Sequence, residues 1–143
     1  TCIGVSNGAN IAMMTGYLVA NVTRVASLIG TLNWNLKQNY RSFAIFAKQK
    51  ITDQSDKIKN EIEQLHPLKH YQKMDKLPHI LIQNGLIDTT INIVEAEGSF
   101  GKLYNIYEMK GLEHLFVFKK YNRCGHRVTP EMVNDVIHWL SEQ

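Results

Sequence analysis

Apolar positions along the chain alternate between short runs and helical stripes. Runs rich in β-branched residues and bounded by Gly or Pro predict buried strands, while apolar side chains three or four residues apart predict helices. Thr129 is the expected N-cap of the last helix, with proline as its first residue. The predicted strands are residues 1–5, 24–29, 79–83 and 115–118, and the predicted helices are residues 9–19, 93–109 and a last helix from Pro130.

The order of these elements predicts an α/β fold, a parallel sheet with flanking helices. Successive strands are separated by segments long enough to cross over a face of the sheet, and such crossovers make neighbouring strands parallel. No internal repeat or low-complexity tract interrupts the order, so we expect a single domain over residues 1–143.

Residues 31–76 depart from this order and are interpreted as a helical insertion. They carry nine basic and five acidic residues, a net charge of +4. A charged stretch over residues 53–64 is typical of a solvated helical face. The insertion opens with four aromatic residues that either line a substrate pocket or anchor the segment: Trp34, Tyr40, Phe43 and Phe46.

Composition excludes several classes of protein. The 143 residues are 44% hydrophobic and 20% charged, as in ordinary globular domains. A net charge of +3 is too small and dispersed for nucleic acid binding, and no apolar run reaches the ~20 residues of a membrane span.

Cys2 and Cys124 share no close spacing with each other or with paired histidines, so we expect free thiols, no metal, no cofactor and a reducing cytoplasmic location. The chain opens with Thr1 and shows no leader pattern, so we expect a piece cut from a longer protein.

The pentapeptide at residues 4–8 (GVSNG) is the first candidate for chemistry. Gly-x-Ser-x-Gly occurs by chance in roughly one chain in twenty of this length, so its position matters more than its letters. Here it joins a predicted strand to a predicted helix, where glycines leave room for a strained turn that raises the serine hydroxyl above the sheet edge. We expect Ser6 to be a nucleophile and the backbone N–H of Asn7 to be an oxyanion donor.

A serine nucleophile needs a base, and the base needs a carboxylate that orients it. Ligand chemistry in open parallel sheets lies at the carboxyl ends of strands. His126 follows the strand of residues 115–118 and is the candidate base, against the alternative of an ordinary surface or core histidine. The other five histidines precede strands, lie in the insertion or lie within the last helix: His79, His114, His66, His70 and His138.

Asp88 is the candidate orienting carboxylate because it follows the strand of residues 79–83. The alternative is a turn residue that caps the next helix. Asp75 precedes its strand, and Glu131 and Asp135 belong to the last helix, so we expect these three to be surface groups. Cys124, two residues before the candidate base, is either a thiol near the site or a packing residue.

The chain resembles the α/β-hydrolase superfamily in three segments, residues 4–12 (GVSNGANIA), 84–88 (NGLID) and 125–131 (GHRVTPE). It looks most like the carboxylesterase, phospholipase and dienelactone-hydrolase-like branch. The resemblance implies the C-terminal half of that fold, with the insertion in the place of the family's lid. It also implies a triad of Ser6, Asp88 and His126, whose chain order agrees with the fold.

Two features depart from the family pattern. The insertion is longer and more aromatic than in the simplest small esterases. The family's first four strands are absent, together with the loop that carries the second oxyanion donor. Loss of one donor costs about 100- to 1000-fold in turnover, so we expect the isolated chain to be nearly inert. We also expect its elbow strand to be an exposed edge, with self-association or contact with the missing half.

Three functions are compatible with these residues. The leading hypothesis is a serine hydrolase that cleaves a small-molecule carboxylic ester through an acyl-enzyme. A serine peptidase of the prolyl-oligopeptidase type shares the same order of motifs. A non-catalytic binding or assembly module that retains the fold is the third.

Overall fold

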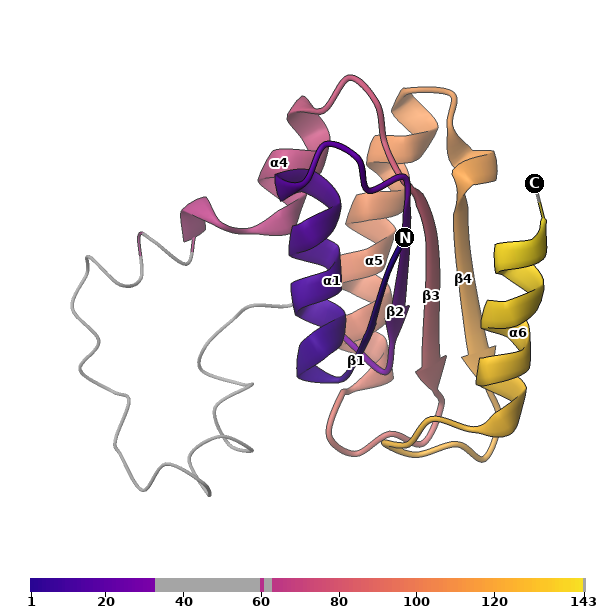
Figure 1. The fold of residues 1–143 in the computed structure, drawn as a ribbon. Helices are drawn as coiled ribbons and strands as arrows, with labels where there is room; N and C mark the ends of the chain where they lie inside the picture. The colour runs from indigo at the N-terminus through magenta and orange to yellow at the C-terminus, as the bar shows by residue number, and fades with distance from the viewer. Residues whose placement is uncertain (33–59, 61–62, 143) are drawn as a thin grey trace.

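The computed structural model describes residues 1–32, 60 and 63–142, and four parallel strands form its central sheet (Figure 1). The sheet order equals the chain order, and each neighbouring pair runs parallel. The predicted α/β class with a parallel sheet is therefore confirmed. The strands are β1 (Cys2–Val5), β2 (Arg24–Leu28), β3 (His79–Gly85) and β4 (Phe116–Tyr121).

Helices cover both faces of the sheet. In Figure 1, α1, α4 and α5 lie on one face and α6 lies on the other. The predicted cap of α6 is confirmed, because the Thr129 hydroxyl accepts a hydrogen bond from the Met132 N–H at 3.3 Å. The helices are α1 (Asn7–Leu18), α4 (Pro67–Lys73), α5 (Ile93–Met109) and α6 (Pro130–Ser141), and a short 3₁₀ turn spans Glu113–Leu115.

Each face of the sheet has its own apolar core. Successive side chains of a strand point to opposite faces, so Ile80 and Ile82 of β3 pack with Phe100 of α5, while Leu81 packs with Met132 of α6. All five side chains are fully buried. Full burial of one such side chain stabilises the fold by about 1.5–3 kcal/mol, which fixes both helices against β3.

The predicted last residues of three strands are wrong by one to three residues. β2 ends at Leu28 because Ile29 adopts a positive φ of 47°. β3 continues through Asn84 and Gly85, which pair with the end of β4, so the turn predicted there lies two residues later, at Leu86 and Ile87. β4 starts after the 3₁₀ turn and runs to Tyr121, three residues beyond the predicted end, because a hydrophobic pattern does not count its two lysines.

The strand β4 continues through Lys119 and Lys120 because carboxylates of the helices on the two faces form ion pairs with them. Lys119 Nζ lies 2.9 Å from a carboxylate oxygen of Asp135 in α6, and Lys120 Nζ lies 2.8 Å from Glu97 of α5. Polar side chains are thus accommodated at the edge of the sheet, and β4 stays paired to the end of β3.

The predicted insertion is described only in part. Its four aromatic residues and most of the charged stretch at 53–64 lie outside the described residues. Its last part includes α4, whose Tyr71 is fully buried and donates a hydrogen bond to the Met13 carbonyl of α1 at 3.0 Å. This end of the segment is therefore packed on the same face of the sheet as α1 and α5.

Candidate active site

Ser6 sits at a sharp turn between β1 and α1. Its backbone has φ 54° and ψ −117°, a conformation that favours glycine, and its side chain makes no capping bond to the helix. Its N–H donates to the Leu28 carbonyl at 2.9 Å, which fixes the turn to the end of β2. Holding a serine in this conformation costs about 1–3 kcal/mol, and its Oγ lies 2.9 Å from Nε2 of His126.

The two glycines of the pentapeptide have different surroundings. A Cβ on Gly4 would lie 1.9 Å from the Gly8 carbonyl oxygen, so no other residue fits there without moving the turn. A Cβ on Gly8 would meet nothing within 4 Å in the described part of the chain. The expectation that both glycines make room for the turn is therefore confirmed for the first and wrong for the second.

Asp88 follows β3 by three residues, and both of its carboxylate oxygens are occupied. Oδ1 accepts from the N–H groups of Thr90 and Ile91 at 2.8 and 2.9 Å, and Oδ2 lies 2.8 Å from Nδ1 of His126. The side chain is fully buried. One oxygen therefore holds the turn and the other faces the imidazole. Asp88 does not cap the next helix, since the N-cap of α5 is Asn92, and its orienting role stays a prediction.

His126 lies in the loop between β4 and α6 and bridges the other two residues. Its ring reaches Asp88 through Nδ1 and Ser6 through Nε2, at 2.8 and 2.9 Å. Because a carboxylate only accepts hydrogen bonds, Nδ1 carries the ring proton and Nε2 is left to accept the serine hydroxyl. A quarter of the side chain remains exposed, so the imidazole is open to solvent on one side.

The loops that carry Asp88 and His126 are packed tightly on each other. The Ile87 N–H donates to the Cys124 carbonyl at 3.1 Å. A Cβ on Gly85 would lie 2.1 Å from that same carbonyl oxygen. Glycine is required at this position by the close approach of the second loop.

Cys124 is a packing residue of this loop. It is buried, and its thiol lies 3.4 Å from the Gly125 carbonyl and 3.5 Å from the Arg127 carbonyl. Of the two interpretations of this thiol, the contacts favour packing.

The remaining histidines lie away from this cluster, as the sequence predicted. One begins β3, one lies in the 3₁₀ turn before β4, two belong to the α4 region and one lies in α6: His79, His114, His66, His70 and His138. Burial lowers the pKa of His66 and of His79.

Sequence reasoning missed a buried polar network next to the site. Gln83, Tyr121 and Asp135 are joined by hydrogen bonds between β3, β4 and α6. Asp135 is therefore not simply a surface group. A polar residue inside an apolar strand run, as in HILIQNG, is the one sequence signal that points to Gln83.

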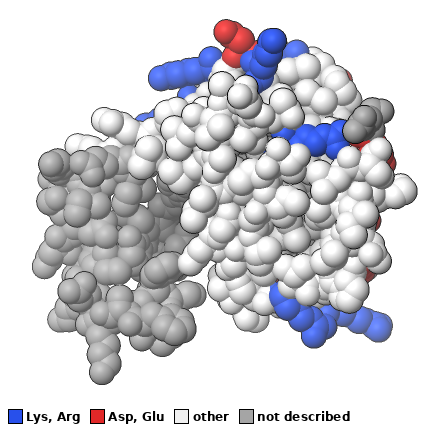
Figure 2. All heavy atoms as spheres, in the orientation of Figure 1, with Lys and Arg blue, Asp and Glu red and all other residues white. Residues whose placement is uncertain are grey.

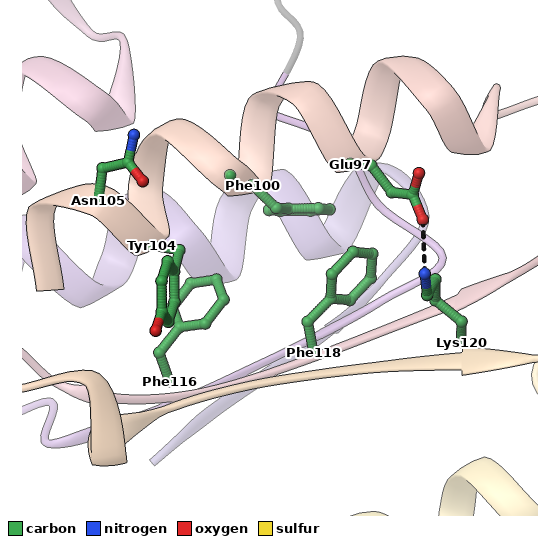
Figure 3. A pocket seen from close by; sticks show the side chains of 8 residues that line it. Glu97, Phe100, Tyr104, Asn105, Phe116, Phe118 and Lys120 are labelled. Carbon is green, nitrogen blue, oxygen red and sulfur yellow. Dashed lines mark hydrogen bonds and ion pairs between the residues drawn. The ribbon is translucent and has the colours of Figure 1, made fainter. Parts of the chain in front are cut away.

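A separate groove of about 340 Å³ lies between α5 and β4, and none of the three clustered residues lines it (Figure 3). Phe100 packs against Phe118 and Tyr104 against Phe116, with ring centroids 5.4 and 5.6 Å apart. The Lys120–Glu97 ion pair lies at one end of the groove (Figure 3). The groove is thus distinct from the cluster.

The described residues contain neither a candidate metal site nor a helix that could span a membrane. Within residues 1–32, 60 and 63–142, no three His, Cys, Asp or Glu side chains gather in a way that would hold a metal ion. In the same part of the chain, no helix combines the length and apolar character needed to cross a bilayer.

No protein-family model matches the chain, and no curated protein matches its sequence. Solved structures do match its fold. TT1662 from Thermus thermophilus is 19% identical with a TM-score of 0.71, over 99% of this chain and 54% of that one. Esterase PE8 is 16% identical with a TM-score of 0.61, over 98% and 48%. An acylaminoacyl peptidase in complex with Z-Gly-Gly-Phe-chloromethyl ketone is 14% identical with a TM-score of 0.69, over 99% and 23%.

These structures are α/β hydrolases, and the four parallel strands with their flanking helices are part of that fold. The predicted fold is confirmed by structures that share fewer than a fifth of their residues with this chain. The chain spans about half the length of the first two.

Proposed function

We propose that this chain belongs to a serine hydrolase that cleaves carboxylic esters through an acyl-enzyme. The observation that carries the proposal is the unbroken hydrogen-bonded line from Ser6 Oγ through the His126 ring to Asp88. It runs between three segments that are far apart in sequence, and the serine is held in a strained backbone conformation. Strain of this kind persists where the surrounding structure imposes it and often marks a functional site.

Each residue of the line has a role in the proposed reaction. Nε2 of His126 takes the proton of the Ser6 hydroxyl as the oxygen attacks the ester carbonyl. Asp88 holds the imidazole in the right tautomer and stabilises the imidazolium that forms. The imidazolium then returns the proton to the leaving alcohol, and the acyl group stays on the serine oxygen. Water, activated by the same imidazole, releases the carboxylic acid.

The N-terminus of α1 provides the first oxyanion donor in this proposal. The first N–H groups of a helix have no partner within the helix. The N–H of Asn7 is the first of them and follows the nucleophile directly. A backbone N–H at this position stabilises the negative oxygen of a tetrahedral intermediate, and one such donor contributes about 100- to 1000-fold in turnover.

Ester and peptide substrates remain the two alternatives for this site. Esterase PE8 and the acylaminoacyl peptidase share the fold, and their names correspond to one alternative each. We favour the ester because an alkoxide is a better leaving group than an amide anion, so ester cleavage demands less of these three residues than peptide cleavage. Two free cysteines support our proposal of a cytoplasmic location.

The second oxyanion donor and a further part of the sheet are proposed to come from the half of the α/β-hydrolase fold that this chain does not span. β1 is an edge strand without charge or proline, and Ile3 and Val5 are 48% and 46% exposed. Figure 2 shows few charged side chains over the middle of the face on which β1 lies. In the absence of that half we expect self-association, and a clean monomer in sedimentation would contradict this.

The test is labelling and turnover, with Ser6→Ala as the matched control. A fluorophosphonate should label the wild-type chain and not the variant. With the complementary half of the fold added, a short-chain aryl ester should give a burst of chromophore that the variant lacks, whereas a peptide anilide should not. No labelling and no turnover under either condition would leave the non-catalytic module as the better interpretation.

A further inference from the structure

Gln83 joins the ends of three strands although its side chain is completely buried. Its Nε2 donates to the Tyr121 hydroxyl at 2.6 Å and to the Met132 carbonyl at 3.1 Å. The main-chain carbonyl of Gln83 accepts a hydrogen bond from the Ile29 N–H at 2.7 Å. A buried carboxamide without partners costs roughly 2 kcal/mol or more. Nε2 is satisfied by its two bonds, whereas the side-chain Oε1 has no hydrogen-bond partner among the described residues.

Tyr121 passes the network on to α6. Its hydroxyl accepts from Gln83 and donates to a carboxylate oxygen of Asp135. Burial, together with that carboxylate, raises the pKa of Tyr121 well above its usual value, and the hydroxyl lowers the pKa of Asp135. At neutral pH the hydroxyl is therefore protonated, and the bond to the carboxylate is charge-assisted.

The Gln83–Tyr121 hydrogen bond connects β3 and β4 close to where the loops with Asp88 and His126 begin. Asp88 follows Gln83 by five residues, and His126 follows Tyr121 by five residues. Next to this bond, the Leu86 N–H donates to the Tyr121 carbonyl at 3.0 Å. The two loops are thus fixed relative to each other at their origins by one side-chain and one main-chain hydrogen bond.

The serine turn is connected to the same point through main-chain bonds. The Ser6 N–H donates to the Leu28 carbonyl at 2.9 Å, and the next residue, Ile29, donates to the Gln83 carbonyl at 2.7 Å. All three segments that contribute to the hydrogen-bonded line therefore meet at Gln83.

We propose that Gln83 and Tyr121 are positioning residues of the site, which set the separation of the loops bearing Asp88 and His126. This inference rests on the proposed function for its effect on rate, but its structural consequence is measurable without any turnover. Misplacement of a reacting group by 1 Å lowers the reaction rate about 100-fold. A smaller displacement of the imidazole should therefore lower the rate about 10-fold.

The experiment compares Tyr121→Phe with Tyr107→Phe. Both rings are buried, and each hydroxyl donates one hydrogen bond, from Tyr107 to the Pro78 carbonyl at 2.7 Å. Pro78 directly precedes β3, at the opposite end of the strand from Asp88. The control therefore loses a buried tyrosine hydrogen bond away from the site, whereas Tyr121→Phe also removes the acceptor of the Gln83 bond.

Two readouts are taken on each variant. The first is the proton NMR signal of His126 Nδ1–H, which reports the hydrogen bond to Asp88. The second is the rate of Ser6 labelling by a fluorophosphonate. Tyr121→Phe should shift or broaden the imidazole signal and slow labelling about 10-fold relative to Tyr107→Phe, which should match the wild type in both readouts.

The outcomes separate this inference from the proposed function. Tyr121→Phe and Tyr107→Phe with equal imidazole signals and equal labelling rates would overturn the positioning role and leave the hydrolase proposal standing. An imidazole signal changed only in Tyr121→Phe, with no labelling of the wild type, would support positioning and remove the hydrolase proposal. Asp135→Ala, at the partly exposed end of the network, should change the signal in the same direction by less, and it replaces Tyr121→Phe if that variant does not fold.

Discussion

Gly85→Ala is the substitution that most directly tests the packing of the two loops. A Cβ at this position would lie 2.1 Å from the Cys124 carbonyl oxygen, 2.7 Å from its carbon and 2.9 Å from the Gly125 carbonyl oxygen. All three atoms belong to the backbone, so no flexible side chain can move aside. The loop that carries His126 must shift as a whole.

The size of the shift follows from the contact distances. Real Cβ atoms essentially never approach other heavy atoms within 3.0 Å, so the 2.1 Å contact must lengthen by about 0.9 Å. His126 lies two residues beyond Cys124 and only 2.8 Å from its carboxylate partner, so little of that movement is absorbed before the imidazole. We expect a loss of about 1–3 kcal/mol in the free energy of unfolding and a labelling rate about 100-fold lower.

The matched control is Gly98→Ala. A Cβ there meets nothing within 4 Å, and the residue lies in the interior of α5, so alanine should stabilise by about 0.5–1 kcal/mol. Urea unfolding and fluorophosphonate labelling are measured on both variants and the wild type. A folded Gly85→Ala protein that is labelled as fast as the wild type would refute the argument, because the loop would then have moved without displacing the imidazole.

Three further predictions concern other positions. Arg24→Ala should lower the free energy of unfolding by about 1–2 kcal/mol in urea titrations, because the guanidinium donates to the carbonyls of Trp139 at 2.8 Å and of Leu140 at 3.1 Å at the end of α6; an unchanged midpoint would contradict this. Ser6→Gly should abolish labelling yet raise the free energy of unfolding by about 1 kcal/mol, because glycine adopts this backbone conformation without strain. The thermal midpoint should rise accordingly, and a lower midpoint would show that the turn is not strained. Asp135 has a lowered pKa, so the stability it contributes is present above about pH 4 and is lost as the pH falls through its folded value; Asp135→Asn should therefore lose less stability than the wild type between about pH 5 and pH 2, and parallel curves would refute this.

Local patterns predicted most of the elements because their signals are contained in a few neighbouring residues. The Thr129 cap and the following proline set the start of α6, and the apolar run after Pro78 set the start of β3. Strand ends were less predictable. β4 extends through Lys119 because a carboxylate on α6 pairs with it, and that partner is known only once the helix is placed.

The site shows the same division. Chain order and position relative to the strands were enough to predict that Ser6, Asp88 and His126 lie together, because parallel strands bring their carboxyl ends to one edge of the sheet. Their catalytic roles stay a proposal. The pattern did not reveal that Asp135 belongs to a network beside the site. A helix residue that reaches a tyrosine of a strand is visible only in three dimensions.

By itself, the sequence determined the class of fold, the order of its elements and the residues able to carry chemistry, since these depend on composition, periodicity and the geometry of short turns. Only the tertiary structure decided which hydrogen bonds those residues make, that Gly4 is sterically required and Gly8 is not, and that Gln83 connects the three loops. The reason is physical. Hydrogen bonds and close contacts act over a few ångströms, so they depend on how distant segments of the chain pack, which no local pattern encodes.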